Sequence, residues 1–353
     1  MYKISTIIPI YNAEDYLEVA INSIINQTFG FENIELILVD DNSSDNSGII
    51  IKKYADKYDN VIALKLDKNS GLPGKPRNRG IDYSTSPYLI FIDADDEYLP
   101  QAFELLYDAI EKEGSDFVMG AHFWNLNGER LRVNILHYCD DTSDVININP
   151  LLNQKNFDRV SHNHVAPWGK IFRKSILEKN NIRFPEDTLA EDTYFYFKVL
   201  INSKKVTLLP NNEMYVYNIV ENSKSIIHEH NLDKFNYFLN GLIKVKAVLD
   251  DVPFSKEIPI TSNIGSLLLM FSNLKWKDKN DAALRIYDFE SSLDEKVVFQ
   301  KKEIEILNNA IMNRQFKRAI IISELYSLLY NNETIKNIYR KFNAKNKKRY
   351  SKE

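Results

Sequence analysis

The chain has a single cysteine, Cys139, in 353 residues. One cysteine excludes an internal disulfide and a cysteine-based zinc site, and it fits a reducing compartment such as the cytosol. No run approaches the ~18 consecutive apolar residues that a membrane-spanning helix needs. Residues 2–5 lead at once into a strand-like run, so no signal peptide is expected. These features argue against secreted, integral-membrane and disulfide-scaffold proteins.

A large excess of either charge is also missing. The 45 Lys and Arg residues nearly balance 49 Asp and Glu residues, which leaves a net charge of −4. Nucleic acid usually binds a basic domain, so it is not an expected partner. With 44% hydrophobic and 27% charged residues, the composition is that of an ordinary globular protein, and the length suggests two domains.

The first hundred residues alternate between strand-like and helix-like periods. Short apolar, β-branched runs predict buried strands, and apolar residues at helical spacing predict helices between them. This alternation is typical of an α/β fold, with a mostly parallel sheet and helices on both faces. The predicted strands are 4–10, 34–39, 61–66 and 88–92, and the predicted helices are 17–25 and 49–58. Glycine and proline predict a loop over 69–80.

Beyond residue 100 the pattern changes twice. The first domain continues with a helix at 102–110, a strand at 116–121, a polar surface excursion over 125–165, helices at 171–179 and 193–200, and short strands at 206–209 and 214–218. After about residue 231 only helical spacing recurs, at 235–249, 264–274, 301–312 and 317–330. The sequence therefore predicts an α/β domain over 1–225 and a C-terminal α-helical domain over 226–353.

Acidic side chains follow two of the predicted parallel strands. Asp40 and Asp41 end the second strand, and Asp93 and Asp95 follow the fourth. The carboxyl ends of parallel strands share one edge of a sheet, where ligands bind, so these carboxylates are expected to lie together. Neighbouring carboxylates repel unless a cation compensates, and hard oxygen ligands suit Mg²⁺ or Mn²⁺ on a diphosphate. Asp is also common in turns after strands, so the Asp-x-Asp pattern alone is weak evidence. The inference depends on its position after a buried strand, next to Asp40 and Asp41 at the end of a neighbouring strand.

Six ordered motifs resemble those of family 2 glycosyltransferases, which have a GT-A fold. They cover about the first 200 residues and are Pro9-x-Tyr11-Asn12, Val39-Asp40-Asp41-Asn42-Ser43-Ser44-Asp45, Asn69-Ser70-Gly71, Arg77-Asn78-x-Gly80, Asp93-x-Asp95-Asp96 and Glu191-Asp192. The segment 69–78 and the helical C-terminal region most resemble bacterial enzymes that glycosylate poly(ribitol phosphate) wall teichoic acid.

The resemblance implies an inverting, metal-dependent glycosyltransferase in the cytoplasm. It would move a sugar, with N-acetylglucosamine first, from a UDP-sugar to a hydroxyl of a cell-envelope polymer, with poly(ribitol phosphate) first. A capsular polysaccharide or a glycoprotein glycan is the alternative acceptor. A non-catalytic UDP-sugar-binding scaffold protein is the alternative of another class.

The nucleotide would bind at the ends of the first three strands. By the resemblance, Asp41 accepts a hydrogen bond from the uracil imide, and Pro9 and Tyr11 frame the base. Asn69 lies in the loop after the third strand. Arg77 would contact base or phosphate, because a guanidinium suits bidentate anion recognition. The alternative for Arg77 is a surface charge.

The metal and the diphosphate would lie at the end of the fourth strand. Asp93 and Ala94 belong to the expected nucleotide-sugar site, with Asp93 on the ribose, and Asp95 would hold Mn²⁺ or Mg²⁺. Related enzymes carry a further metal-binding histidine shortly after the last strand of the domain. Here Lys224 stands at the nearest corresponding position, so either His228 replaces that histidine or Lys224 contacts phosphate directly.

Asp192 is the expected general base, with Glu191 in a secondary role on the acceptor side. The resemblance implies that Asp192 deprotonates the acceptor hydroxyl before one in-line displacement. An acid at this point could instead be an N-cap residue of the helix that follows.

Three residues are expected on the acceptor side. Trp168 would either stack on a sugar face or belong to the core. Arg130 and Arg132 would either pair with phosphates of an anionic acceptor or be solvated loop residues.

The C-terminal region offers two further hypotheses. Apolar residues at helical spacing favour a homo-oligomer, a trimer by the resemblance, through Ile322, Leu325 and Leu329; packing within one chain is the alternative. The last 18 residues carry eight Lys or Arg against one acid. This run is either a solvated terminus or a contact with an anionic membrane face, worth ~1 kcal/mol per basic residue.

Overall fold

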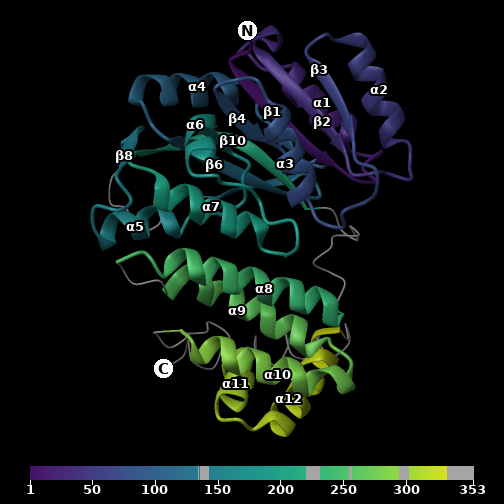
Figure 1. The fold of residues 1–353 in the computed structure, drawn as a ribbon, viewed down its shortest axis with the longest axis vertical. Helices are drawn as coiled ribbons and strands as arrows, with labels where there is room; N and C mark the ends of the chain where they lie inside the picture. The colour runs from purple at the N-terminus through teal and green to yellow at the C-terminus, as the bar shows by residue number, and fades with distance from the viewer. Residues whose placement is uncertain (134, 136–142, 220–230, 254–256, 294–301, 332–353) are drawn as a thin grey trace, which may run out of the picture. The chain divides into compact units, whose positions relative to one another are not determined.

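The computed structural model describes residues 1–133, 135, 143–219, 231–253, 257–293 and 302–331 (Figure 1). The chain separates into two compact units. The first comprises Met1–Ser223 with Lys244–Lys256, and the second comprises Lys224–Ile243 with Glu257–Glu353. Residues 244–256, which the sequence placed in the helical domain, therefore group with the α/β unit. In keeping with this, Lys244 Nζ donates a 2.5 Å hydrogen bond to Asp187 Oδ1.

Four parallel strands form the N-terminal half of the sheet in the order β3-β2-β1-β4. The strands are β1 (Ile4–Ile10), β2 (Ile34–Asp40), β3 (Val61–Lys65) and β4 (Tyr88–Phe91). Every residue of β2 is buried and only Pro9 of β1 is not, as expected of central strands covered on both faces. Ile10 lies in register with Asp40, so both strands end at the same edge of the sheet.

The second half of the sheet is mixed. It continues from β4 in the order β9-β6-β10-β5, with β7 on β6 and β8 on β10. Strand β9 is antiparallel to β4 and to β6, while β10 runs parallel to β6, so β4, β6 and β10 all point the same way. The strands are β5 (Glu97–Tyr98), β6 (Phe117–Leu126), β7 (Glu129–Val133), β8 (Ile146–Ile148), β9 (Lys170–Arg173) and β10 (Val206–Ile219).

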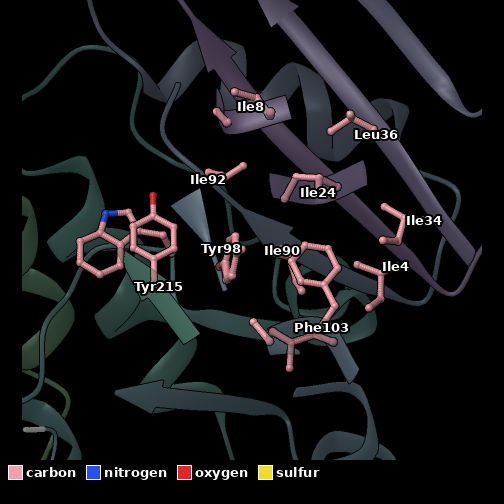
Figure 2. Close-up of a cluster of buried hydrophobic side chains, with 14 of the residues drawn as sticks. Ile4, Ile8, Ile24, Ile34, Leu36, Ile90, Ile92, Tyr98, Phe103 and Tyr215 are labelled. Carbon is pink, nitrogen blue, oxygen red and sulfur yellow. The ribbon is translucent and has the colours of Figure 1, made fainter. Parts of the chain in front are cut away.

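Helices cover both faces of this sheet, with α4 and α7 on opposite sides (Figure 1). They are α1 (Leu17–Ile25), α2 (Ser47–Lys57), α3 (Gly74–Tyr83), α4 (Ala102–Glu113), α5 (Gln154–Ser161), α6 (Lys174–Lys179) and α7 (Glu191–Asn202), with one 3₁₀ turn at Phe31–Asn33. On one face, isoleucines of β1 pack with Ile24 and Phe103 and reach Tyr98 and Tyr215 (Figure 2). On the other, the Phe91 ring lies 5.8 Å from that of Phe195 of α7.

The second unit is helical. Its helices are α8 (Leu232–Leu249), which also contributes its last residues to the first unit, α9 (Glu257–Ser272), α10 (Trp276–Ser291), α11 (Lys302–Met312) and α12 (Phe316–Asn331). Helix α10 was not anticipated from the sequence, because polar and charged residues dominate it. In the part of the chain that the structure describes, no helix is long and apolar enough to cross a membrane.

The predicted loop over 69–80 is wrong in its second part, where helix α3 begins at Gly74. Two glycines misled the prediction, since they serve close packing rather than turning. A Cβ on Gly74 would lie 2.3 Å from the Pro185 carbonyl oxygen, and one on Gly80 would lie 2.4 Å from Ile7 Cγ2. Pro76 is tolerated because it lies in the first turn, where amides have no partner within the helix.

Three other expectations differ from the structure. The predicted helix over 171–179 begins instead as strand β9, since Ile171 and Phe172 are fully buried between β4 and β6; short apolar runs do not separate strand from helix. The polar excursion over 125–165 contains β7, β8 and α5. The two short strands predicted at 206–209 and 214–218 are one strand, β10, with a register shift between Leu209 and Tyr215.

Candidate functional site

The ends of β1 and β2 and the loop after β3 bring the predicted base-binding residues to one edge of the sheet. Asp41 is buried, and its carboxylate accepts hydrogen bonds from Ser70 N (2.9 Å) and Ser70 Oγ (2.8 Å). Burial raises the pKa of Asp41, and the bonds from Ser70 oppose that shift. Asn69 Oδ1 accepts from Gly71 N, which shapes the turn. Pro9 is half-buried, and Tyr11 leaves 51% of its surface exposed, as a ligand-facing aromatic would.

The turn after β4 holds three carboxylates in different environments. Asp96 is fully buried and accepts hydrogen bonds from Tyr215 Oη (2.8 Å) and Asn218 N (2.7 Å). The Asp93 amide donates to Tyr215 Oη, and Asn218 Nδ2 donates to the Asp95 carbonyl. Strand β10 therefore fixes the turn, and Asp96 is a structural residue of it. The sequence did not identify Tyr215 and Asn218, because they lie about 120 residues further along the chain.

Asp95 is the carboxylate of this turn best suited to a cation. It is half-buried, and burial followed by the charge of Asp93 raises the pKa of Asp95 to about 6. A cation relieves such like-charge repulsion, and carboxylate oxygens suit Mg²⁺ or Mn²⁺. Among the described residues, however, no group of three or more His, Cys, Asp or Glu could hold a metal ion. Lys224 and His228, the predicted completions of the site, lie outside those residues.

Arg77 joins the two halves of the site. Its guanidinium is buried, and Nη2 donates to Asp93 Oδ1 (2.9 Å) at the end of β4. Nη1 donates to Glu191 Oε1 (3.1 Å) and to Asp192 Oδ1 (2.6 Å) at the start of α7. The Phe184 ring lies 5.3 Å from the guanidinium carbon and covers the cation.

The surface-charge alternative for Arg77 is wrong, because the side chain is buried. The contact of Arg77 with base or phosphate stays a prediction, and the guanidinium meets three carboxylates of its own chain. The negative charges of the carboxylates after β4 and at the start of α7 are therefore balanced by a cation of the protein itself, and not by a ligand alone.

Asp192 retains a high proton affinity despite this contact. Burial raises the pKa of Asp192 to about 8; Arg77 opposes the shift, while Glu191 and Asp93 add to it. Burial also raises the pKa of Glu191. The N-cap alternative does not apply to Asp192, because helix α7 begins at Glu191 after Ala190, whose φ of 63° is left-handed.

The predicted acceptor residues differ in their surroundings. Trp168 is 5% exposed and stacks on Tyr215 at 4.3 Å between ring centroids, so it belongs to the core and offers no face to a sugar. Arg132 is bound to Glu213 and to the Pro210 carbonyl, which leaves Arg130, exposed on β7, as the freer of the two arginines.

Exposed aromatic residues lie beyond Trp168 on β6 and β10. Tyr217 stacks on Trp168 at 5.6 Å and is 38% exposed. Trp124 lies in register with Tyr217 and with Leu131 of β7, and both Trp124 and Leu131 are about half exposed. This surface was not predicted from the sequence. Its only signal was the alternation of apolar residues at 124 and 126, where the segment taken for polar loop begins.

The predicted oligomer residues are only partly described. Ile322 of α12 is half-buried, while nothing is described of the side chains of Leu325 and Leu329. The basic run at 336–352 also lies outside the described residues.

Comparison with known proteins identifies the family of this chain. A model described as glycosyl transferase family 2 matches residues 5–180. The poly(ribitol-phosphate) beta-glucosyltransferase of Bacillus spizizenii is 31% identical over 60% of this chain and 32% of its own length. The poly(ribitol-phosphate) beta-N-acetylglucosaminyltransferase TarP of Staphylococcus aureus is 31% identical over 61% of this chain and 63% of its own length. The chain spans about a third of the length of several of these curated relatives.

Solved structures share the fold. A fragment of S. aureus TarS in complex with UDP-GlcNAc superposes with a TM-score of 0.71 over 92% of this chain and 91% of that one, at 22% identity. The same fragment with UDP gives 0.67. The prediction of a GT-A-like sheet followed by helices is therefore confirmed.

Proposed function

Since residues 5–180 belong to glycosyl transferase family 2, we propose that the chain transfers a sugar from a UDP-sugar to a hydroxyl of a cell-envelope glycopolymer, with inversion at the anomeric carbon. The observation that carries the proposal is the position of Arg77. It ties Asp93, on the donor side of the sheet, to Asp192, the candidate base, through two hydrogen bonds.

The donor side is formed by the ends of β1 to β4. Asp41 would accept from the uracil imide with the oxygen lone pairs that Ser70 leaves available, and Tyr11 would lie on the base. Asn69 and Ala94 would border the same nucleotide. Asp93 would contact the ribose with the oxygen that Arg77 does not bind.

Asp95 would hold a divalent metal, with His228 as the proposed further ligand. A bound Mn²⁺ or Mg²⁺ would neutralise the negative charge that develops on the UDP leaving group. The carboxylates of Asp93 and Asp95 support this assignment, because their mutual repulsion favours a cation.

Asp192 is the proposed general base. Its carboxylate takes the proton of the acceptor hydroxyl as that oxygen forms a bond to the anomeric carbon, and the bond between that carbon and the diphosphate oxygen breaks. A pKa of about 8 suits this step, since a base works best when its pKa lies near the working pH. Glu191 is directed at Arg77 and would shape the acceptor side.

The acceptor would lie on the β6–β7–β10 half of the sheet, across β4 from the nucleotide. We propose poly(ribitol phosphate), which the names of the B. spizizenii and S. aureus relatives specify for those proteins. Arg130, and Arg132 after exchange from Glu213, would meet its phosphates. Trp124 and Tyr217 take the stacking role first assigned to Trp168.

Three further proposals follow from the same relatives and from the sequence. UDP-GlcNAc is the first donor to test, with UDP-glucose second, since both an N-acetylglucosaminyltransferase and a glucosyltransferase are among the matching relatives.

The enzyme would be cytoplasmic. Its basic residues at 336–352 would contact an anionic membrane face and so bring the enzyme to its polymer. A trimer would form through the C-terminal helices.

The test is UDP release from a panel of UDP-sugars, with Mn²⁺, Mg²⁺ or EDTA, in the presence and absence of poly(ribitol phosphate). We expect the enzyme to turn over one of the UDP-sugars, to require the metal ion for this turnover, and to release UDP faster when the polymer is present. Turnover without stimulation by this polymer moves the acceptor to a capsular or glycoprotein glycan. Binding of UDP-sugar without turnover on any acceptor favours the scaffold protein, and no binding contradicts the proposal.

A further inference from the structure

Lys170 is a fully buried lysine for which the proposed reaction gives no role. Its Nζ lies 2.7 Å from the carbonyl oxygen of Ala166, 3.0 Å from that of His164 and 3.5 Å from that of Trp168. An ammonium has three N–H donors and no acceptor, whereas a neutral amine would turn a lone pair toward one of these oxygens. The three carbonyls therefore match a charged Lys170, which fixes the segment 164–168.

This buried cation faces the helix that carries the candidate base. Lys170 Nζ lies 5.4 Å from the centroid of the Tyr196 ring. Tyr196 follows Asp192 by four residues in α7, so both side chains lie on the same face of that helix. Among the described residues no carboxylate forms an ion pair with Lys170, so Asp192, one turn away along this face, is the acid placed to balance it.

Two histidines also lie near Lys170. His164 Nε2 lies 3.5 Å from Nζ, and the His122 ring lies 4.6 Å from that of His164. Burial, followed by the charge of Lys170, lowers the pKa of both, that of His122 to about 4. Both are therefore neutral near pH 7. Burial likewise lowers the pKa of Lys170, and the charge of Asp192 opposes that shift.

We propose that Lys170 is a positioning residue for the candidate base, whose ammonium holds the segment 164–168 against α7 and favours the ionised form of Asp192. This inference rests on the proposed function, because it assigns the base to Asp192. A lysine with only a structural role would hold the same segment without changing the proton affinity of Asp192.

The first test is the pH dependence of transfer in Lys170→Met. Loss of the ammonium removes a charge that favours the carboxylate, so the acid limb of the profile moves to higher pH by about one pH unit. Lys170→Arg, which keeps the charge, restores the limb. If Lys170→Met does not fold, Lys170→Gln, which keeps two N–H donors without the charge, carries the same expectation. An acid limb that stays at the wild-type pH overturns the proposal.

Lys279 provides the matched control. It is also fully buried, and its Nζ donates to the Ser272 carbonyl (2.8 Å) and to Ser323 Oγ (2.9 Å) in the second unit. Lys279→Met removes a buried ammonium without touching the site. We expect it to lower thermal stability and to leave the acid limb in place.

A second test does not depend on turnover. The thermal midpoint is measured at each pH unit from 6 to 9 for Lys170→Met, Asp192→Asn and the double variant, because Asp192 ionises near pH 8 and burial lowers the pKa of Lys170. If the two charges are coupled, Lys170→Met lowers the thermal midpoint more when Asp192 is present than when it is replaced by Asn. Equal lowering in the two backgrounds overturns the proposal. A wild-type protein that turns over no UDP-sugar contradicts the proposed function alone, since this cycle still reports the pairing.

Discussion

Arg77 Nη1 donates a 2.6 Å hydrogen bond to Asp192 Oδ1 across 115 residues of sequence. The same guanidinium binds Asp93 at the end of β4, so one buried cation fixes the distance between the donor strand and the candidate base. In a displacement reaction this distance decides whether the acceptor oxygen meets the anomeric carbon in line.

The first prediction concerns this cation. Arg77→Ala leaves three partly buried carboxylates without their partner, and breaking a buried pair in this way costs about 3–5 kcal/mol. We expect urea unfolding to report a loss of that size and transfer to fall by at least ~100-fold, because the base loses its orientation.

Arg183→Ala is the control for Arg77. Arg183 forms an exposed ion pair with Asp82, whose side chain is 55% exposed, and such pairs are worth about 1 kcal/mol or less. Wild-type transfer by Arg77→Ala would contradict the role of the cation at the site.

The second prediction is a pH profile. Because the pKa of Asp192 is raised to about 8, kcat/KM for transfer should rise about tenfold per pH unit below pH 8 and then level off. Asp192→Asn should lose ~10²–10⁴-fold of the rate at the plateau. A profile that is flat between pH 6 and 9 would exclude Asp192 as the titrating base.

The same carboxyl has a consequence for stability. A folded-state pKa above the ordinary value of 3.8 means that the folded protein binds this proton more tightly than the unfolded chain does. Stability from this group is therefore complete below about pH 4 and is lost as pH rises toward about 8. Asp192→Asn should flatten that fall, as measured by the free energy of unfolding at pH 5 and pH 9.

Part of this site could be predicted from sequence and part could not. Asp41, Asp93 and Asp192 follow or begin regular elements, so the positions of the elements alone bring them to one edge of the sheet. The partners of Arg77 lie 114 and 115 residues away on α7, and no local pattern identifies pairs at that separation. The burial of Trp168 depends in the same way on Tyr215, 47 positions later in the chain.

The fold shows the same division. The strands β1 and β2 agree with prediction to within a residue, because buried apolar runs between turn residues are distinctive. Helix α3 does not, since Gly74 and Gly80 are required by the close approach of Pro185 and Ile7, which only the assembled fold reveals.

The third prediction concerns the helical unit. Glu290 is buried, and its Oε2 accepts a 2.9 Å hydrogen bond from Asn308 Nδ2. In the described part of the chain, Glu290 Oε1 and Asn308 Oδ1 are buried acceptors without a hydrogen bond. A proton on Glu290 supplies the missing donor, and burial raises the pKa of Glu290 to about 7.

Stability should therefore fall as pH rises from about 4.5 through 7, by about 3 kcal/mol in total. Glu290→Gln, whose amide donates to Asn308 Oδ1 at every pH, should unfold at a higher temperature than the wild type at pH 8.5. Asn308→Ala removes the partner and should abolish this gain. A lower melting temperature for Glu290→Gln at pH 8.5 would contradict the pairing.

The fourth prediction concerns the exposed aromatic residues on β6 and β10. An aromatic face suits the apolar face of a sugar or polyol, so Trp124→Ala and Tyr217→Ala should raise KM for the polymer while donor binding stays unchanged. We expect a change of about tenfold from loss of ~1.4 kcal/mol of contact. Tyr83→Ala, an exposed tyrosine at the end of α3, is the control. An unchanged KM in both variants would place the acceptor elsewhere.

Incorporation of labelled sugar into polymer reports both transfer from a UDP-sugar and the role of Asp192 as base. UDP-[¹⁴C]GlcNAc, Mn²⁺ and poly(ribitol phosphate) are incubated with the wild type and with Asp192→Asn at pH 8.5, and label in the polymer is counted. We expect incorporation by the wild type and at most about a hundredth of it by Asp192→Asn. Equal incorporation by the two proteins would contradict this expectation.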